Sequence, residues 1–509
     1  MKKVTGVLLL IFALLIFVNP AFSEDVSSHE KSIEKVENHK AETHKSNGSI
    51  EAKHEDNSHD THHGAPHLDG RNLSLLWVIP FIGILLSIAI FPLVAPHFWH
   101  HHYGKVSLFW GVLFFIAFTI ANGANMSFFY LIEVYLLEFI PFIALLLALF
   151  TVSGGIQLKG ELIGSPKLNI IILLIGTFLA SLMGTTGAAM LLIRPLIRAN
   201  SWRKYRVHTV VFFIFLVANI GGSLTPIGDP PLFLGFLKGV AFDWTLTHMI
   251  TPMLFAVAIL LTVYFIIDTI LYKKESNIPQ KSPNGEKLSV SGKLNFILIV
   301  AVVGAVLLAS MNFGIAFTIH HVDMPTSLLL QVTILLIITF ISLKITSKDI
   351  REGNEFEWEP IREVAKLFAT IFITMVPAIT MLKAGVEGPL GAVIKGVKDS
   401  NGEFINSSFF WATGILSSFL DNAPTYVVFF NTAGGDASYL MNAGAQTLLA
   451  ISAGAVFMGA NTYIGNAPNF MVKSIAESSK IKMPSFFGYM AWSGLILVPT
   501  FILITFVFF

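Results

Sequence analysis

Apolar runs separated by short polar loops make up the chain from residue 73 to its end. A membrane-spanning helix needs about 20 mainly apolar residues. By this criterion the predicted spans are 74–95, 106–123, 130–153, 207–240, 247–271, 294–312, 325–345, 364–384, 446–478 and 484–509. Two further apolar stretches, 168–197 and 408–430, carry polar residues with glycine or proline near the middle. We interpret them as re-entrant hairpins, because non-helical backbone at membrane depth is tolerated where protein or a wet cavity surrounds it.

Two of these spans, 207–240 and 446–478, contain the same motif and are predicted to be broken helices. Residues 222–233 align with residues 459–470, 237 positions later, with six identities in twelve. Each copy has Gly, Pro and polar residues where an apolar helix should continue. Interrupted segments at corresponding positions of two halves indicate the binding site of a transporter with internal repeats.

The two hairpins are related more weakly. Ser181 and Ser417 are 236 positions apart, as are Thr185 and Asp421. We interpret the hairpins as equivalents, so that each half holds one hairpin and one broken helix. The predicted organisation is a first membrane repeat over 73–272, a cytoplasmic loop over 273–293 and a second repeat over 294–509.

Positive charges favour one direction for the spans. If the chain starts outside and the hairpins make no net crossing, the inside loops hold 21 Lys and Arg. The outside loops of the membrane part then hold four, namely Lys238, Lys383, Lys395 and Lys398. Cytoplasmic loops carry the excess of Lys and Arg. The same direction orients the hairpins oppositely, so the chain is predicted to be an all-α polytopic membrane protein with inverted repeats.

Composition supports the membrane class and excludes several chemistries. The chain is 54% hydrophobic and 13% charged, whereas a soluble domain has about 25% charged residues. The absence of cysteine excludes disulfides and thiolate metal sites. The net charge of +1 does not indicate nucleic-acid binding. The sequence shows no nucleophile–base pair and no cofactor motif, so we predict neither an enzyme nor a bound cofactor.

The first 72 residues are expected to lie outside the cytoplasm. Residues 1–23 hold two lysines before an apolar run and small residues, which predicts a cleavable signal peptide, with an uncleaved short anchor as the alternative. Residues 24–72 are polar, acidic and rich in histidine, which predicts a disordered tail. The alternative for this tail is weak collection of Zn²⁺ or Ni²⁺.

Two acids at predicted membrane depth, Asp229 and Asp421, are the candidate ion ligands. A carboxylate in hydrocarbon is costly and must face a polar cavity, so we expect the two acids, one from each half, to meet in one hydrated site. Carboxylate, hydroxyl and amide oxygens suit Na⁺, and a desolvated acid can exchange the ion for a proton. The alternative is that each acid caps the half-helix that follows it. The neutral candidates at the site are Thr185, Thr186, Asn219, Ser223, Thr225, Asn422, Asn461, Thr462 and Asn466.

Charged residues near the predicted cytoplasmic ends of spans are expected to be structural. Asp268 lies near the end of its span and is expected to reach the interface. Three histidines, His100 to His102, lie between Trp99 and Tyr103 and are expected to anchor the inner membrane interface.

These motifs resemble the ion transporter superfamily, which includes NhaD-type sodium/proton antiporters, arsenite permeases and citrate or dicarboxylate carriers. Residues 417–425 are similar to the NhaD and arsenite-permease hairpin, and residues 219–231 to the NhaD broken helix. Thr185 and Thr186 depart from the NhaD pattern, which has an Asp-Asn pair in this hairpin. The resemblance covers 74–509 and implies a scaffold domain that forms a homodimer and a transport domain that moves by alternating access.

The favoured functional prediction is a sodium/proton antiporter of the bacterial inner membrane, in which Asp229 and Asp421 bind Na⁺. One alternative is a Na⁺- or H⁺-coupled carrier of citrate or another carboxylate, with hydrogen-bond donors from Thr185, Thr186 and Asn422. A second alternative is a metal-handling transporter that uses the His-rich tail. The expected partners are the lipid bilayer, a small ion and a second copy of the chain.

Overall fold

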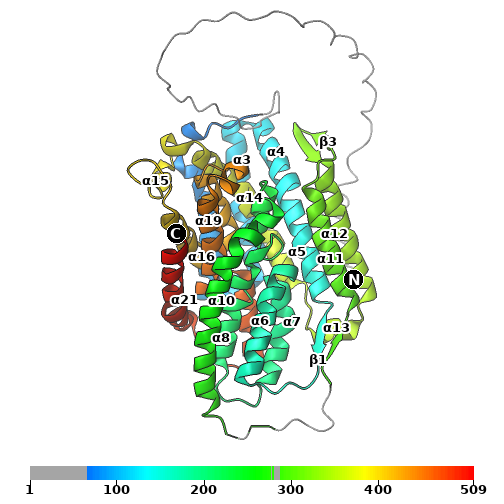
Figure 1. Ribbon diagram of the computed structural model, residues 1–509. Helices are drawn as coiled ribbons and strands as arrows, with labels where there is room; N and C mark the ends of the chain where they lie inside the picture. Colours follow the sequence, from blue (N-terminus) through cyan, green and yellow to red (C-terminus); the bar gives the residue numbers. More distant parts are fainter. Residues whose placement is uncertain (1–65, 277, 280–286) are drawn as a thin grey trace, which may run out of the picture. The chain divides into compact units, whose positions relative to one another are not determined.

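The computed structural model describes residues 66–276, 278–279 and 287–509 (Figure 1). The predicted signal peptide lies outside these residues, as does the predicted tail up to residue 65. The end of that tail is ordered, which corrects its predicted boundary at 72. Leu68 is buried and its backbone N–H donates to the Tyr130 hydroxyl at 3.2 Å. Gly70 lies so close to the Thr380 carbonyl that a Cβ there would be 2.0 Å from its oxygen. An apolar side chain and a close backbone contact therefore fix these residues to the helices.

The described chain is mostly helical, which confirms the predicted all-α class. The longer helices are α2 (Ile79–Val94), α3 (Pro96–Asn122), α4 (Ala124–Val134), α5 (Ile140–Ser153), α6 (Pro166–Met183), α7 (Thr185–Ala199), α8 (Val207–Leu216), α10 (Phe242–Tyr272), α11 (Leu294–Ala309), α12 (Thr326–Ile345), α14 (Glu359–Lys383), α16 (Asn406–Phe419), α17 (Asn422–Thr432), α19 (Ala445–Met458), α20 (Ala467–Ser478) and α21 (Phe486–Phe508). The shorter ones are η1 (Gly70–Asn72), η2 (Leu75–Val78), the π-helical turn η3 (Tyr135–Phe139), η4 (Ile220–Leu224), α9 (Pro230–Leu237), α13 (Lys348–Gly353), η5 (Gly385–Glu387), α15 (Gly391–Lys395), α18 (Ala437–Met441) and η6 (Gly459–Asn461).

Four short strands form two antiparallel pairs in the loops. Strand β1 (Gln157–Lys159) pairs with β2 (Ser289–Ser291), with Leu158 opposite Val290. Strand β3 (Ile315–Ile319) pairs with β4 (Val322–Pro325), with a register shift near the start of β3. The first pair ties the loop after α5 to the segment before α11.

Nine helical segments among the described residues are long and apolar enough to cross a membrane, which identifies a multi-pass membrane protein. Burial differs sharply between them. The segment Val207–Leu224 holds α8 and η4, and 94% of its 18-residue apolar stretch is buried inside the fold. The buried share of the corresponding stretch of α3 is 17%. The first broken helix is therefore enclosed by other helices, while α3 turns most of its surface outward. On another side of the fold, α11 and α12 pack against each other and against α5 (Figure 1).

The two predicted hairpins are helix pairs. Helices α6 and α7 pack against each other and are joined at Gly184, whose φ of 78° lies in the region that favours glycine. Their open ends meet, because the Gly164 N–H donates to the Ala199 carbonyl at 2.7 Å. Helices α16 and α17 also pack against each other. Of the first pair, α6 but not α7 is long and apolar enough to cross a membrane by itself. Whether this pair enters and leaves on the same side therefore stays a prediction.

Two contacts join segments that the charge pattern assigns to the same side. On the predicted inside, β1 pairs with β2, and Arg194 bonds Glu355 at 2.8 Å. The guanidinium holds the pKa of the Glu355 carboxyl below its usual range. Lys238, which is predicted to lie outside, bonds Glu138 at 3.0 Å, and Glu138 lies in η3 inside the predicted span 130–153. The first two contacts agree with the predicted sidedness, because each joins residues assigned to the inside.

Asp268 does not reach an interface, contrary to the expectation from its place in the span. Its carboxylate is fully buried, 2.5 Å from the Arg203 guanidinium, which is also fully buried. The His208 ring lies 2.8 Å from the same carboxylate oxygen, and the Tyr264 hydroxyl and Asn169 amide donate to the other one. Because the charge is paired and hydrogen-bonded inside the helix bundle, it needs no water.

Candidate functional site

Both predicted broken helices are interrupted at the repeated motif. In the first copy, α8 ends at Leu216, a 3-10 turn follows as η4, and α9 begins at Pro230. In the second copy, α19 ends at Met458, η6 follows, and α20 begins at Ala467. Proline lies in the first turn of both restarted helices, where its missing N–H costs no hydrogen bond.

The glycines shared by the two copies let the backbone cross itself closely. A Cβ at Gly228 would lie 2.2 Å from the Gly222 oxygen. A Cβ at Gly465 would lie 2.5 Å from the Gly459 oxygen. No real Cβ comes this close, so both crossings require glycine. The two glycine identities of the repeat are therefore explained by the same close contact in each half.

A serine in each hairpin holds the broken helix of its own half. Ser181 donates to the Gly221 carbonyl and accepts from the Leu224 N–H at 3.1 Å. The Thr225 hydroxyl in turn donates to the Ser181 carbonyl. Thr225, expected to be an ion ligand, thus uses its hydroxyl proton to fix the hairpin to the interrupted helix.

The second half has a similar arrangement with partners 237 positions later. The Ser418 hydroxyl lies 3.0 Å from the Met458 carbonyl and 2.7 Å from the Gly414 carbonyl of its own helix, and it accepts from the side-chain amide of Asn461 at 2.9 Å. The Thr462 hydroxyl donates to the Ser418 carbonyl at 2.5 Å. Ser418 is therefore the equivalent of Ser181, which corrects the pairing with Ser417 by one residue. The corrected offset equals that of the stronger motif.

Asp229 lies at the centre of the site, 1% exposed. Its Oδ1 accepts from the Thr185 hydroxyl and the Asn466 amide, both at 3.1 Å. Its Oδ2 accepts from the Asn422 amide at 2.6 Å. At the corrected offset Thr185 and Asn422 are equivalents, and Asn466 is the equivalent of Asp229 itself. The cluster therefore draws on the hairpin and the broken helix of both halves.

Asp421 has a different environment from Asp229. Its side chain accepts from the Ala423 N–H at 3.0 Å and caps α17, and the residue is partly exposed. Asp229 precedes α9 but makes no side-chain capping bond. Asn422, adjacent to Asp421, donates to Asp229 at 2.6 Å, so Asp421 borders the cluster around Asp229. Helix capping, the alternative role for both acids, is thus observed for Asp421 and not for Asp229. The residue of this hairpin that reaches Asp229 is Asn422, one position after Asp421.

Two asparagines connect the cluster to the second broken helix. The Asn219 oxygen accepts from the Asn466 amide at 3.3 Å, and the Asn219 amide donates to the Asn469 oxygen at 2.7 Å. Asn469 donates to the Gly459 and Thr462 carbonyls, both at 2.9 Å. Asn469 is fully buried and was missed by the sequence analysis. The signal was present, because an amide at 469 replaces the apolar Leu232 of the other copy.

Three oxygens of the predicted site residues are buried and have no hydrogen-bond partner among the described residues. They are Ser223 Oγ, Asn422 Oδ1 and Asn461 Oδ1. Buried polar atoms are almost always paired with protein or water, so these atoms are candidates to contact a bound ion or water. Thr186 is partly exposed, and no hydrogen bond joins it to Asp229 in this part of the chain. Among the described residues, there is no group of three or more His, Cys, Asp or Glu side chains that could hold a metal ion.

Four helices begin at this cluster, two from each half. Helix α7 begins at Thr185 and α17 at Asn422, and both of these residues donate to Asp229. Helix α9 begins directly after Asp229, and α20 directly after Asn466. Helix N-termini carry partial positive charge and unpaired N–H groups. The arrangement stabilises negative charge at the position of the Asp229 carboxylate.

The sequence matches a family model described as "Putative citrate transport" over residues 70–509. The match includes both hairpins, both broken helices and every residue of the cluster. No curated protein matches the chain.

Proposed function

The chain belongs to this citrate transport family, and we propose that it is a secondary transporter that couples a carboxylate anion such as citrate to Na⁺ or H⁺. This conclusion replaces sodium/proton antiport as the favoured function. The family membership supports a carboxylate cargo, whereas antiport was inferred from the acidic and neutral oxygen side chains at the breaks and from motif resemblance. The observation that carries the proposal is the convergence of four helix N-termini on one buried carboxylate.

The N-termini supply the anion-binding part of the proposed site. Backbone N–H groups at helix starts bind carboxylates and phosphates without a basic side chain. In transporters, half-helix N-termini point at anionic substrate groups near the middle of the membrane. Here α7, α9, α17 and α20 provide four such ends. Citrate carries several carboxylates, which suits a site with several helix starts.

Asp229 supplies the coupling in this proposal. An ionised Asp229 repels an incoming carboxylate, whereas a protonated or Na⁺-bound Asp229 does not. The hydrogen bonds to Asp229 come from neutral side chains, Thr185, Asn422 and Asn466. The unpaired oxygens of Ser223 and Asn422 are additional ligands for Na⁺. Binding of the cation first and the anion second would make the movement of one depend on the other.

Sodium/proton antiport is the second candidate, and a specific observation favours it. No Lys or Arg forms a salt bridge with Asp229 or Asp421 among the described residues. The described cluster therefore presents acids and neutral oxygens but no fixed positive side chain for an anion. In this alternative Asp229 exchanges Na⁺ for H⁺, with Asp421 as a neighbouring acid.

Transport by the purified protein in liposomes distinguishes the two candidates. Radiolabelled citrate uptake is measured with a Na⁺ gradient, with a pH gradient and with neither. We expect uptake only with a gradient, and none for Asp229→Asn. A pH-sensitive dye measures proton movement on addition of Na⁺, Li⁺ or K⁺ without citrate. Proton movement driven by Na⁺ with no citrate uptake under any gradient would refute the main proposal and support antiport.

The remaining predictions are proposals of the same kind. Residues 24–65 lie outside the described chain, so metal handling by the His-rich tail is tested by deleting residues 24–70 and measuring Zn²⁺ tolerance. An unchanged tolerance would remove that alternative. Location in the inner membrane with an extracytoplasmic tail, homodimer formation and alternating access stay as expected from the charge pattern and the resemblance. Membership of a transporter family is our ground for expecting a transporter and not an enzyme.

A further inference from the structure

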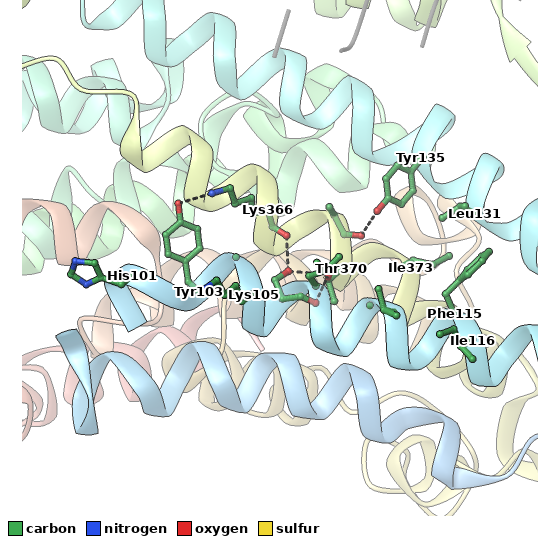
Figure 2. Close-up of a pocket in the computed structure, with 16 residues that line it drawn as sticks. His101, Tyr103, Lys105, Phe115, Ile116, Leu131, Tyr135, Lys366, Thr370 and Ile373 are labelled. Carbon is green, nitrogen blue, oxygen red and sulfur yellow. Dashed lines mark hydrogen bonds between the residues drawn. The ribbon is translucent and has the colours of Figure 1, made fainter. Parts of the chain in front are cut away.

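A groove of about 650 Å³ lies between α3, the junction of α4 with η3, and α14 (Figure 2). None of its lining residues belongs to the cluster around Asp229. Helix α3 forms most of one wall. Of the nine candidate spans among the described residues, it has the smallest buried share of its apolar stretch. The groove therefore opens on a surface that a membrane protein presents to lipid or to another protein.

One end of the groove is basic. Lys105, Lys366 and His101 lie there with Tyr103 (Figure 2), and all three basic residues are exposed. The Lys366 ammonium lies 4.9 Å from the centroid of the Tyr103 ring. Neither lysine forms a salt bridge with the described residues.

Two acids lie near this end and have other partners. Glu359 accepts from the Tyr103 hydroxyl at 2.8 Å and bonds Arg362 at 2.9 Å. Glu363 accepts from the Trp99 indole at 3.1 Å. Lys366 also donates to the Tyr103 hydroxyl at 3.4 Å, but neither acid forms a salt bridge with Lys366 or Lys105, so no ion pair of the described residues neutralises the two lysines.

The other end of the groove is apolar. Phe115, Ile116 and Leu131 lie there (Figure 2), and Leu108 and Val112 lie between the two ends on α3. Lys105 and Ile116 are 11 residues apart, which is about 16 Å along a helix. This length is about half of the 30 Å hydrocarbon core of a bilayer. The groove thus has one charged end and an apolar length of one leaflet.

We propose that this groove binds an anionic phospholipid of the cytoplasmic leaflet. The phosphate lies against Lys105 and Lys366, and an acyl chain follows α3 past Val112 to Ile116. The basic end adjoins the start of α14, directly after the loop of Glu355, which the charge pattern assigns to the inside. Anionic lipids of that leaflet attract basic residues, and basic pockets between helices bind their headgroups.

Native mass spectrometry of the purified full chain tests the proposal with phosphatidylglycerol and phosphatidylcholine of identical acyl chains. We expect tighter binding of phosphatidylglycerol. We also expect about 30-fold weaker binding by the Lys105→Ala/Lys366→Ala variant, since each basic residue near an anionic surface contributes about fivefold. Lys383→Ala is the matched control, because this exposed lysine lies at the opposite end of α14, and it should bind like the wild type.

A second variant tests the apolar part without changing charge. Val112→Trp fills the groove from an exposed position and should weaken phosphatidylglycerol binding while the elution volume and Tm stay unchanged. Equal binding of the two lipids by the wild type, or unchanged binding by both groove variants, would overturn the proposal. A dimer that dissociates in Val112→Trp would also overturn it, because a second copy of the chain would then occupy the groove.

Discussion

Replacing Asp229 by Asn and by Ala should separate the transport role of this acid from its role in stability. In Asp229→Asn the remaining oxygen can keep the Thr185 and Asn466 bonds. The new amide faces Asn422, whose own oxygen has no partner and can turn to accept from it. Hydrogen bonds to charged groups contribute about 1 kcal/mol more than neutral ones, and removal of a buried charge offsets part of that loss. The expected destabilisation is therefore within about 2 kcal/mol.

Asp229→Ala should behave differently in the folded state. It leaves three buried donors, on Thr185, Asn422 and Asn466, without an acceptor. Each unsatisfied buried donor costs about 1–3 kcal/mol, so we expect a loss of at least about 3 kcal/mol. Thermal unfolding in detergent should rank the wild type first, Asp229→Asn slightly lower and Asp229→Ala far lower.

Transport should not follow that ranking. Neither variant can take up a proton or cation at this position, so both should lose gradient-driven citrate uptake in liposomes by about a hundredfold or more, which corresponds to about 2.7 kcal/mol. The control is Asp243→Asn, an exposed acid at the start of α10, which should transport like the wild type. Wild-type uptake by folded Asp229→Asn would refute the coupling role of Asp229.

Three further predictions use other contacts of the fold. Thr185→Val removes one donor to Asp229 and should slow uptake about tenfold, since such a bond contributes about 1.5 kcal/mol, while Thr185→Ser should restore it. Gly228→Ala places a Cβ 2.2 Å from a carbonyl oxygen and should prevent stable folding, whereas Gly304→Ala meets no atom within 4 Å and should be tolerated; the readout is monodisperse elution after purification. Asp268→Ala leaves Arg203 buried without its partner and should destabilise the protein by about 3–5 kcal/mol in thermal unfolding.

Each of these predictions has an outcome that contradicts it. Equal loss of uptake in Thr185→Ser and Thr185→Val would mean that the methyl group and not the hydroxyl matters. Normal elution of Gly228→Ala would show that the backbone crossing is looser than the structure indicates. An unchanged Tm for Asp268→Ala would show that the buried ion pair contributes little to stability.

The sequence was sufficient for the fold class and for the positions of the two helix breaks. Apolar length alone predicts spans, because a helix that crosses hydrocarbon must satisfy its backbone internally and cover itself with apolar side chains. The repeated motif predicted both helix breaks correctly, since glycine, proline and polar residues within an apolar segment are easily recognised in the sequence. All ten neutral or acidic candidates other than Asp229 lie in or directly beside the two hairpins and two broken helices described above.

Contact register was harder to predict from the sequence. The weak similarity of the hairpins suggested an offset of 236, whereas the hydrogen bonds of Ser181 and Ser418 follow an offset of 237. One residue is a rotation of about 100° on a helix. For this reason the sequence paired Thr185 with Asp421, while the structure directs Thr185 and Asn422 at Asp229.

The amino-acid sequence by itself determined that this is a helical membrane protein with two related halves and polar breaks at corresponding positions. Only the tertiary structure decided that Asp229 is surrounded by donors from both halves, that Asp421 caps a helix, and that Asp268 is paired inside the bundle. The physical reason is that hydropathy and helix breaking act along the chain. Pairing of buried polar groups depends on which side chains from distant segments are brought within hydrogen-bonding distance of each other, and that depends on packing.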